Sequence, residues 1–206
     1  MSARRCGRRA SNGWSSRPAR PFTAITVKAR RLPDTPKAPL TPYASDKLAG
    51  EQYLDFYRRQ HGFEPVVFRF FNIFGPRQDP SSPYSGVISI FAERAVKGLP
   101  IAVFGDGEQT RDFFYVQDLV DLVVQGIEKP VVEEGAVNVG LNATTSLNQL
   151  LAALADVVGN LPTVSYLPAR SGDIKHSRAS NQRLLARFDV PEPTPLKVGL
   201  ARLLGR

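Results

Sequence analysis

The most constraining feature of the sequence is an almost continuous apolar run over residues 65–71, directly after a helical pattern. Such a run is typical of a strand buried on both faces, as in a parallel sheet covered by helices. The helical pattern spans residues 43–61 and ends at Gly62. Its expected buried stripe consists of Ala44, Leu48, Leu54 and Tyr57. A helix that leads into a buried strand predicts a crossover connection, so we expect an α/β fold.

Further helices and strands are expected at short spacing along the rest of the chain. The helices are predicted over residues 87–96, 118–128, 147–158, 181–188 and 195–204. The strands are predicted over residues 101–104, 112–116, 136–140 and 163–167. Asp118 can cap one helix, and Thr145 or Ser146 can cap another. The repeated change between strand and helix supports the α/β class.

The basic charge of the chain belongs to its N-terminal segment. The net charge is +8, but residues 1–33 are rich in arginine and lack acidic residues, and the remainder is close to charge balance. We expect residues 1–38 to form a disordered basic arm, apart from a short apolar run at 22–27 that is compatible with a strand. Its aromatic residues are Trp14 and Phe22, too few for base stacking, so nucleic-acid binding is disfavoured.

The sequence predicts a protein of a reducing compartment, the cytoplasm. A single cysteine, Cys6, excludes an internal disulfide. No apolar run is long enough to suggest a membrane span, and we expect no metal site. The arm lacks the apolar segment of a secretory signal, although its arginine and serine content resembles an organelle transit peptide.

Tyr43 and Lys47 stand four residues apart at the start of the first predicted helix, so their side chains leave the same face. A lysine ammonium beside a phenol favours the phenolate, and such a pair can exchange a proton with a substrate hydroxyl. The same spacing is common on solvated helices. By itself it does not distinguish an acid/base pair from an ordinary surface turn.

Four motifs in order resemble the extended short-chain dehydrogenase/reductases. They are the Tyr43/Lys47 pair, residues 69–77 (RFFNIFGPR), residues 103–113 (VFGDGEQTRDF) and residues 170–173 (RSGD). Within that group they most resemble NAD-dependent nucleotide-sugar epimerases and dehydratases of the UDP-glucose 4-epimerase type. The resemblance covers residues 39–206 and implies the C-terminal part of a Rossmann-like parallel sheet with a small α/β substrate-binding lobe.

The resemblance implies a role for the tyrosine and lysine pair. Tyr43 would remove a proton from a sugar hydroxyl while NAD takes a hydride from the same carbon. Lys47 would hydrogen-bond the nicotinamide ribose, and Phe71 would lie near the nicotinamide. These three residues are therefore the expected NAD contacts, and the first two are the expected catalytic residues.

The resemblance also implies a site for a UDP-sugar. Asn72, Arg111 and Arg170 would hold the diphosphate, a task that suits guanidinium groups because their geometry matches phosphate oxygens. Asp173 would accept hydrogen bonds from the ribose hydroxyls. The residues expected around the uracil are Ala102, Val103, Phe104 and, on another wall, Val87. Gly86 and Ser89 depart from the residues frequent in the family, which puts local substrate contacts in doubt.

Two family features are not found before Tyr43: the Gly-x-x-Gly-x-x-Gly turn that binds the NAD pyrophosphate, and a serine or threonine that assists proton transfer. We therefore expect a truncated epimerase, inactive alone, in which NAD binding is in doubt. Residues 1–38 are interpreted as an out-of-frame or mis-started segment. On this interpretation the strand at 65–71 would have an unpaired apolar edge.

Other functions stay open on the sequence. A nucleotide-sugar dehydratase would place its acidic pair upstream of Tyr43, where the family resemblance does not extend. A non-catalytic UDP-sugar-binding module would need only the residues expected to bind the UDP-sugar. The resemblance further implies a homodimer that uses the helix bearing Tyr43.

Overall fold

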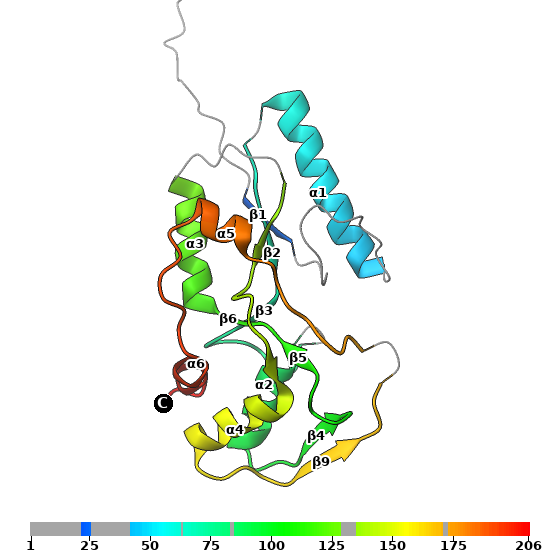
Figure 1. The fold of residues 1–206 in the computed structure, drawn as a ribbon, viewed down its shortest axis with the longest axis vertical. Helices are drawn as coiled ribbons and strands as arrows, with labels where there is room; N and C mark the ends of the chain where they lie inside the picture. The colour runs from blue at the N-terminus through cyan, green and yellow to red at the C-terminus, as the bar shows by residue number, and fades with distance from the viewer. Residues whose placement is uncertain (1–21, 26–41, 63, 83–84, 129–134, 171–172) are drawn as a thin grey trace, which may run out of the picture.

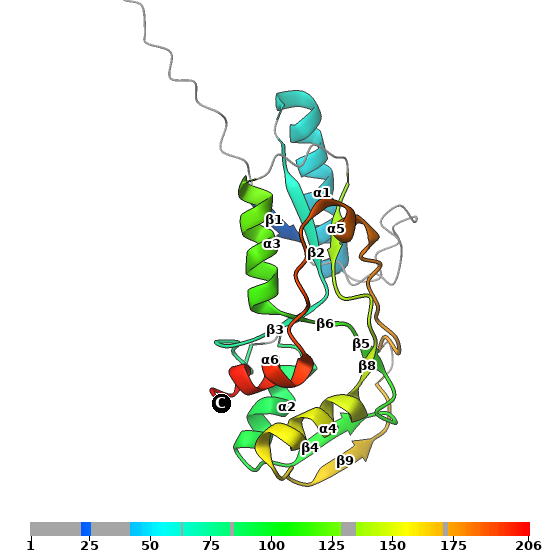
Figure 2. The same cartoon turned by 60° about the vertical axis from the view of Figure 1, so that its left-hand side comes forward.

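The computed structural model describes residues 22–25, 42–62, 64–82, 85–128, 135–170 and 173–206. The predicted disordered arm falls mainly on residues 1–21 and 26–38, which lie outside the described residues. Figures 1 and 2 show two layered parts, one around strands β1, β2 and β7 and one around helices α2 and α4. No helix in the described ranges is both long and apolar enough to cross a membrane.

The first part is built on a parallel sheet with strand order β1-β2-β7. These strands span Phe22–Ile25, Val66–Phe70 and Val137–Val139, with Phe22 opposite Val66 and Phe68 opposite Val137. The α/β class and the parallel sheet are thus confirmed. The predicted unpaired edge at residues 65–71 is wrong, because the run at Phe22–Ile25 pairs with β2 on the side opposite β7.

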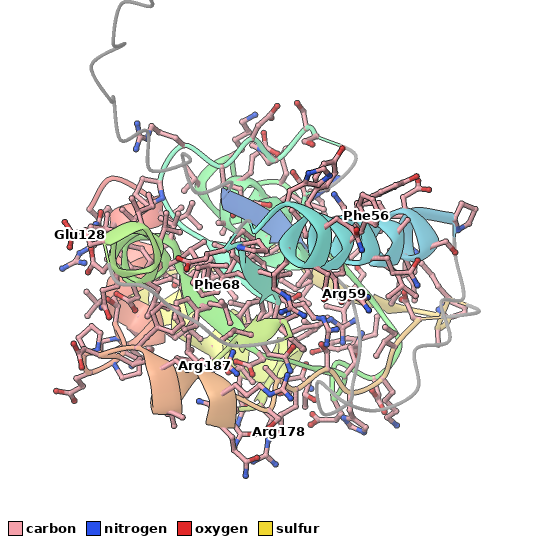
Figure 3. All side chains as sticks on the ribbon, turned by 90° about the horizontal axis from the view of Figure 1, so that it is seen from above. Phe56, Arg59, Phe68, Glu128, Arg178 and Arg187 are labelled. Carbon is pink, nitrogen blue, oxygen red and sulfur yellow. The ribbon has the colours of Figure 1, made fainter. Side chains whose placement is uncertain are left out.

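Helices cover both faces of this sheet: α1 (Pro42–His61) on one side, and α3 (Val116–Glu128) with α5 (Gln182–Arg187) on the other (Figures 1 and 3). Side chains alternate between the faces along β2. The Phe68 ring packs at a tilt against Phe188, with ring centroids 5.2 Å apart, and lies against Gly126 of α3. The next residue, Arg69, points to the opposite side, toward α1.

A buried ion pair fixes α1 on the sheet. Arg69 Nε donates to Glu51 Oε1 at 2.7 Å, and Arg69 Nη2 donates to Glu51 Oε2 at 2.8 Å. Glu51 is the buried residue of this helix, whereas Tyr57, predicted to be buried, is 45% exposed. Ala44, Leu48 and Leu54 of the predicted stripe are half-buried, so the bidentate charge pair is the fully buried contact that α1 adds to a partial apolar face.

The second part contains short strand pairs and three helices. The parallel pairs are β3 (Asn72–Phe74) with β6 (Phe113–Tyr115) and β4 (Ile101–Phe104) with β9 (Val164–Leu167). The antiparallel pair is β5 (Thr110–Arg111) with β8 (Thr145–Ser146). The helices are α2 (Val87–Val96), α4 (Leu147–Val158) and α6 (Leu196–Leu203).

The core of the second part lies between α2, α4, α6 and β4, where Ile101, Val103, Leu150, Leu154 and Leu200 are fully or almost fully buried. The bounds predicted for α2 and β4 are confirmed. Ser146 caps α4 through a capping box with Gln149, as one of the two predicted caps.

Two local predictions are corrected around residue 112. The strand predicted over 112–116 is shortened to β6, because Asp112 lies between β5 and β6 and α3 already begins at Val116. Asp118 therefore lies inside α3 and does not cap it. Its carboxylate instead accepts from the backbone N–H and the hydroxyl of Thr194, which ties α3 to the segment before α6.

Candidate functional site

A cavity of about 500 Å³ lies between α2, β4, β5 and the segment that contains Arg170 and Asp173. The predicted substrate residues that line it are Asn72, Val87, Ala102, Phe104, Arg111, Arg170 and Asp173. Val103 does not line the cavity. Because successive side chains of β4 point to opposite faces, Ala102 and Phe104 reach the cavity while Val103 is buried in the core.

Arg111 is a half-buried cation on the wall of the cavity. Its Nη1 donates to the carbonyl oxygens of Thr110 and Ile174, both at 2.8 Å. Burial lowers the pKa of the Arg111 guanidinium, and the neighbouring Asp173 carboxylate acts in the opposite direction. An arginine keeps its charge at neutral pH even so, because its ordinary pKa lies far above neutral. The cavity therefore contains a fixed positive charge.

Arg170 and Phe104 form a cation–π pair at the same cavity. The guanidinium carbon of Arg170 lies 3.6 Å from the centroid of the Phe104 ring. Such stacking leaves the edge of the planar guanidinium available to donate in its own plane. The pair therefore combines an aromatic surface with a second cation.

Asn72 begins β3, at the carboxyl end of the long sheet strand β2. Its backbone N–H and its side-chain Nδ2 both lie 3.2 Å from the carbonyl oxygen of Asp112, to which they donate. This double contact sets the side chain at the cavity edge. Ligands of open α/β sheets bind at this end of the strands.

Asp112 is fully buried next to Arg111 and binds backbone groups from two distant segments. Its Oδ1 accepts from the N–H of Leu141 at 2.9 Å, and its Oδ2 accepts from Asn142 at 3.1 Å and from Ala179 at 3.0 Å. Burial raises the pKa of the Asp112 carboxyl, and the backbone hydrogen bonds partly offset this effect. Asp112 is a functional-site neighbour that no pattern in the sequence predicts.

Sequence reasoning also missed Arg94 and Gln109, which line the cavity. Arg94 of α2 donates to the carbonyl oxygen of Pro100 at 2.7 Å. Gln109 donates from Nε2 to the carbonyl oxygen of Phe104 at 2.6 Å. Gln109 could have been found from its place in the turn between Phe104 and Arg111, whereas nothing in the sequence distinguishes Arg94 from a solvated helix residue.

The predicted catalytic pair lies outside this cavity. Lys47 Nζ is 5.3 Å from the centroid of the Tyr43 ring, and Tyr43 is 41% exposed at the start of α1. Phe71, between β2 and β3, is half-buried, and its N–H donates to the carbonyl oxygen of Val139 at 3.3 Å. The structure thus brings Tyr43 to Lys47 and brings the substrate residues together, but none of Tyr43, Lys47 and Phe71 lines the cavity.

The cavity suits an anionic ligand with a flat apolar part. Its volume lies within the range of small-molecule sites, about 300–1,000 Å³, and Arg111 and Arg170 present guanidinium groups that match phosphate oxygens. Asp173 can accept from hydroxyls, and Phe104 offers an aromatic face. Fold and site together define a Rossmann-like α/β protein with a cavity beside its sheet that presents two guanidinium groups and an aromatic ring.

The chain belongs to the NAD dependent epimerase/dehydratase family, whose model matches residues 3–140. The match starts well before residue 39, where we expected the resemblance to begin. A UDP-glucose 4-epimerase of Mycolicibacterium smegmatis is 39% identical over 169 residues, which are 82% of this chain and 53% of that relative. The chain thus spans about half the length of the curated relatives that it matches.

Solved structures of this family share the fold. The UDP-N-acetylglucosamine 4-epimerase from Methanobrevibacter ruminantium, in complex with UDP-N-acetylmuramic acid, superimposes with a TM-score of 0.79 at 32% identity, over 89% of this chain and 61% of that one. The UDP-glucose 4-epimerase of Thermus thermophilus, in complex with NAD, gives a TM-score of 0.74 at 31% identity, over 89% and 62%. The Rossmann-like expectation is confirmed.

NAD is the cofactor expected for the family. Among the described residues, Tyr43 and Lys47 offer a hydroxyl and an ammonium group of the kind predicted to face a nicotinamide ribose. No helix of the described ranges begins after a Gly-x-x-Gly-x-x-Gly turn, the element that would bind the pyrophosphate. Within the described ranges, the residues that fit NAD are therefore Tyr43 and Lys47, at its nicotinamide end.

Proposed function

We propose that this chain binds a UDP-sugar and belongs to an NAD-dependent nucleotide-sugar epimerase of the UDP-hexose 4-epimerase type. The observation that carries the proposal is the cavity that gathers Asn72, Arg111, Arg170 and Asp173 around the ring of Phe104. These residue types match the diphosphate, the ribose and the base of such a ligand.

The charges of the cavity suggest how the nucleotide would bind. The diphosphate would lie between Arg111 and Arg170, because two planar cations can each form paired hydrogen bonds with phosphate oxygens. The base would pack near Phe104 and Ala102. Asp173 would accept from a ribose hydroxyl, and its charge would disfavour a phosphate at that end.

The acid/base work of epimerisation would fall to Tyr43. In this reaction the sugar C4 hydroxyl loses a proton and C4 loses a hydride, which gives a 4-keto sugar whose reduction from the other face yields the epimer. When bound, NAD supplies the hydride acceptor. Tyr43 would hold the proton, with the Lys47 ammonium 5.3 Å from the centroid of its ring.

A calorimetric comparison of UDP and UMP tests the binding step. If Arg111 and Arg170 hold the diphosphate, UDP should bind more tightly than UMP, and Arg170→Ala should weaken UDP binding about tenfold or more while changing UMP binding less. Equal affinities for UDP and UMP in the unaltered protein would contradict the proposed site.

A non-catalytic UDP-sugar-binding module is the second candidate function. It is supported by the position of Tyr43 and Lys47 outside the cavity and by the lack of a pyrophosphate-binding turn in the described ranges. We accordingly propose that the chain by itself binds UDP-sugars without turnover. Incubation with UDP-glucose and NAD, followed by separation of the products, distinguishes the candidates: UDP-galactose would indicate an epimerase, a 4-keto-6-deoxy sugar a dehydratase, and unchanged substrate a binding module.

Two further proposals concern the setting of the protein. The exposed aromatic residues of α1, Tyr53 and Phe56, support a homodimer that uses this helix. The single cysteine supports the cytoplasm as its location.

A further inference from the structure

Asp112 is a buried carboxylate for which the proposed reaction has no use. It is 0% exposed, and the hydrogen bonds recorded for it come from backbone N–H groups. Removing a carboxylate from water is costly, and a well-packed apolar side chain would avoid this cost. The segments that the Asp112 carboxylate connects therefore say more about its role than its contribution to the free energy of unfolding does.

The groups that Asp112 connects belong to segments far apart in the sequence. Leu141 and Asn142 follow β7 of the central sheet, at sequence separations of 29 and 30 residues. Ala179 precedes α5, at a separation of 67 residues. A side chain at Gly140 would approach Asp112 Oδ2 to 2.8 Å, so the carboxylate is enclosed as well as bonded.

The same residue adjoins the nucleotide pocket on two sides. Its backbone carbonyl accepts from the N–H and the Nδ2 of Asn72, each at 3.2 Å. The preceding residue in the chain is Arg111, whose guanidinium lines the cavity and donates to Ile174 at 2.8 Å. Asp112 thus contacts or adjoins two residues of the proposed diphosphate site.

Residues 173–179, which we call the strap, run alongside β5 and are attached to it step by step. Thr110 donates its N–H to Lys175 at 2.8 Å and accepts from Ser177 at 3.1 Å. The Asp112 carboxylate then binds Ala179 at 3.0 Å, beyond these contacts. Asp173, at the beginning of the strap, lines the cavity. A loss of the Ala179 contact would therefore loosen a segment that carries a pocket residue.

We propose that Asp112 is a positioning residue whose carboxylate fastens to β5 the strap that carries Asp173 and the carbonyl acceptor of Arg111, and so sets the affinity of the pocket for the nucleotide diphosphate. The inference rests on the proposed UDP-sugar site. It adds a residue that lies outside the cavity but positions two residues, Arg111 and Asp173, that line it.

The test compares two aspartate-to-asparagine variants. Asp112→Asn keeps the shape of the side chain but replaces one acceptor oxygen by an amide group, so at least one backbone N–H loses its acceptor. Asp118→Asn is the matched control. Asp118 also binds a distant backbone N–H, that of Thr194, but it joins α3 to the segment before α6 and does not line the pocket.

We expect Asp112→Asn to weaken UDP binding about tenfold in calorimetry, and Asp118→Asn to change it by less than about twofold. In the ligand-free proteins, amide hydrogen exchange at Ser177 and Ala179 should be faster in Asp112→Asn and unchanged in Asp118→Asn. Similar melting temperatures of the two variants would show that the difference in affinity does not reflect a general loss of stability.

If Asp112→Asn does not fold, the original protein still provides a readout. By reciprocity, UDP should slow the exchange of the Ala179 amide, but not that of the Thr194 amide. Unchanged UDP affinity in Asp112→Asn, or Ala179 exchange that responds neither to this substitution nor to UDP, would overturn the inference. An original protein that binds no UDP would instead overturn the proposed function, while the ligand-free exchange comparison would still decide the role of Asp112.

Discussion

Arg111 is the residue whose chemistry the proposed site uses most directly. Replacement by lysine keeps the positive charge but removes the planar set of donors, one of which already binds Ile174. We expect Arg111→Lys to weaken UDP binding about tenfold, since a point charge cannot bind the strap and the diphosphate together.

Calorimetric titration with UDP measures this change. Arg206→Lys is a suitable control, because Arg206 donates to Val157 at the C-terminal end, outside the cavity. Equal affinities of Arg111→Lys and Arg206→Lys would show that paired hydrogen bonds from Arg111 are not needed.

The Asp112 carboxyl predicts a dependence of stability on pH. Since its folded-state pKa is raised by burial, the folded protein keeps this proton at pH values where the unfolded chain has lost it. The free energy of unfolding should therefore fall as the pH rises from about 4 to the folded-state pKa, and level off above it.

Urea unfolding of the original protein and of Asp112→Asn between about pH 4 and pH 7 isolates this group, because the other carboxyls are common to both proteins. The stability of the original protein relative to the variant should decrease over the lower part of this range. A difference that stays constant with pH would contradict the assignment.

The site residues that could be predicted from the sequence are those that belong to recognisable motifs. Asn72, Arg111, Arg170 and Asp173 come from separate segments, and the family resemblance brought them into one predicted site. Val103 was predicted to line the site because its neighbours Ala102 and Phe104 were. Only the alternation of side chains along β4 shows that it faces the core instead. Asp112 stands beside a predicted residue, but its backbone partners lie 29 to 67 residues away and no local pattern reveals them.

At the scale of elements, the ion pair between Glu51 and Arg69 attaches α1 to β2. Removal of Glu51 leaves the buried Arg69 guanidinium without the carboxylate that pairs with it. We expect Glu51→Ala to lower the free energy of unfolding by about 3 kcal/mol, and the double variant Glu51→Met with Arg69→Met to lower it by much less. Urea unfolding measures both changes, and equal losses would argue against this account of the pair.

The elements that the sequence predicted best are those with a clear start and stop. Helix α4 has a serine cap and a terminal glycine, and α2 is followed by Gly98. Helix α1 was predicted close to its bounds, but its most buried residue, Glu51, was not, because a charged side chain does not show in an apolar pattern. The strand pairing of Phe22–Ile25 depends on β2, which lies more than 40 residues further along.

For the whole molecule, the proposal of a homodimer predicts that α1 forms the contact. Tyr53 is 68% exposed on this helix, and Leu185 of α5 is 58% exposed elsewhere on the surface. We expect the original protein to be dimeric in light scattering coupled to size exclusion. Tyr53→Glu should yield monomers because it places a charge in the apolar contact, whereas Leu185→Glu should remain dimeric. Dissociation by Leu185→Glu alone would place the contact on another face.

The account as a whole stands on the claim that the cavity beside β4 and β5 binds a UDP-sugar. Calorimetric titration of the original protein with UDP-glucose tests it most directly, together with the double variant Arg111→Ala and Arg170→Ala. We predict saturable binding of one ligand per chain in the original protein and loss of detectable binding in the folded double variant. The absence of binding in the original protein, or binding of equal affinity in both, would contradict the account.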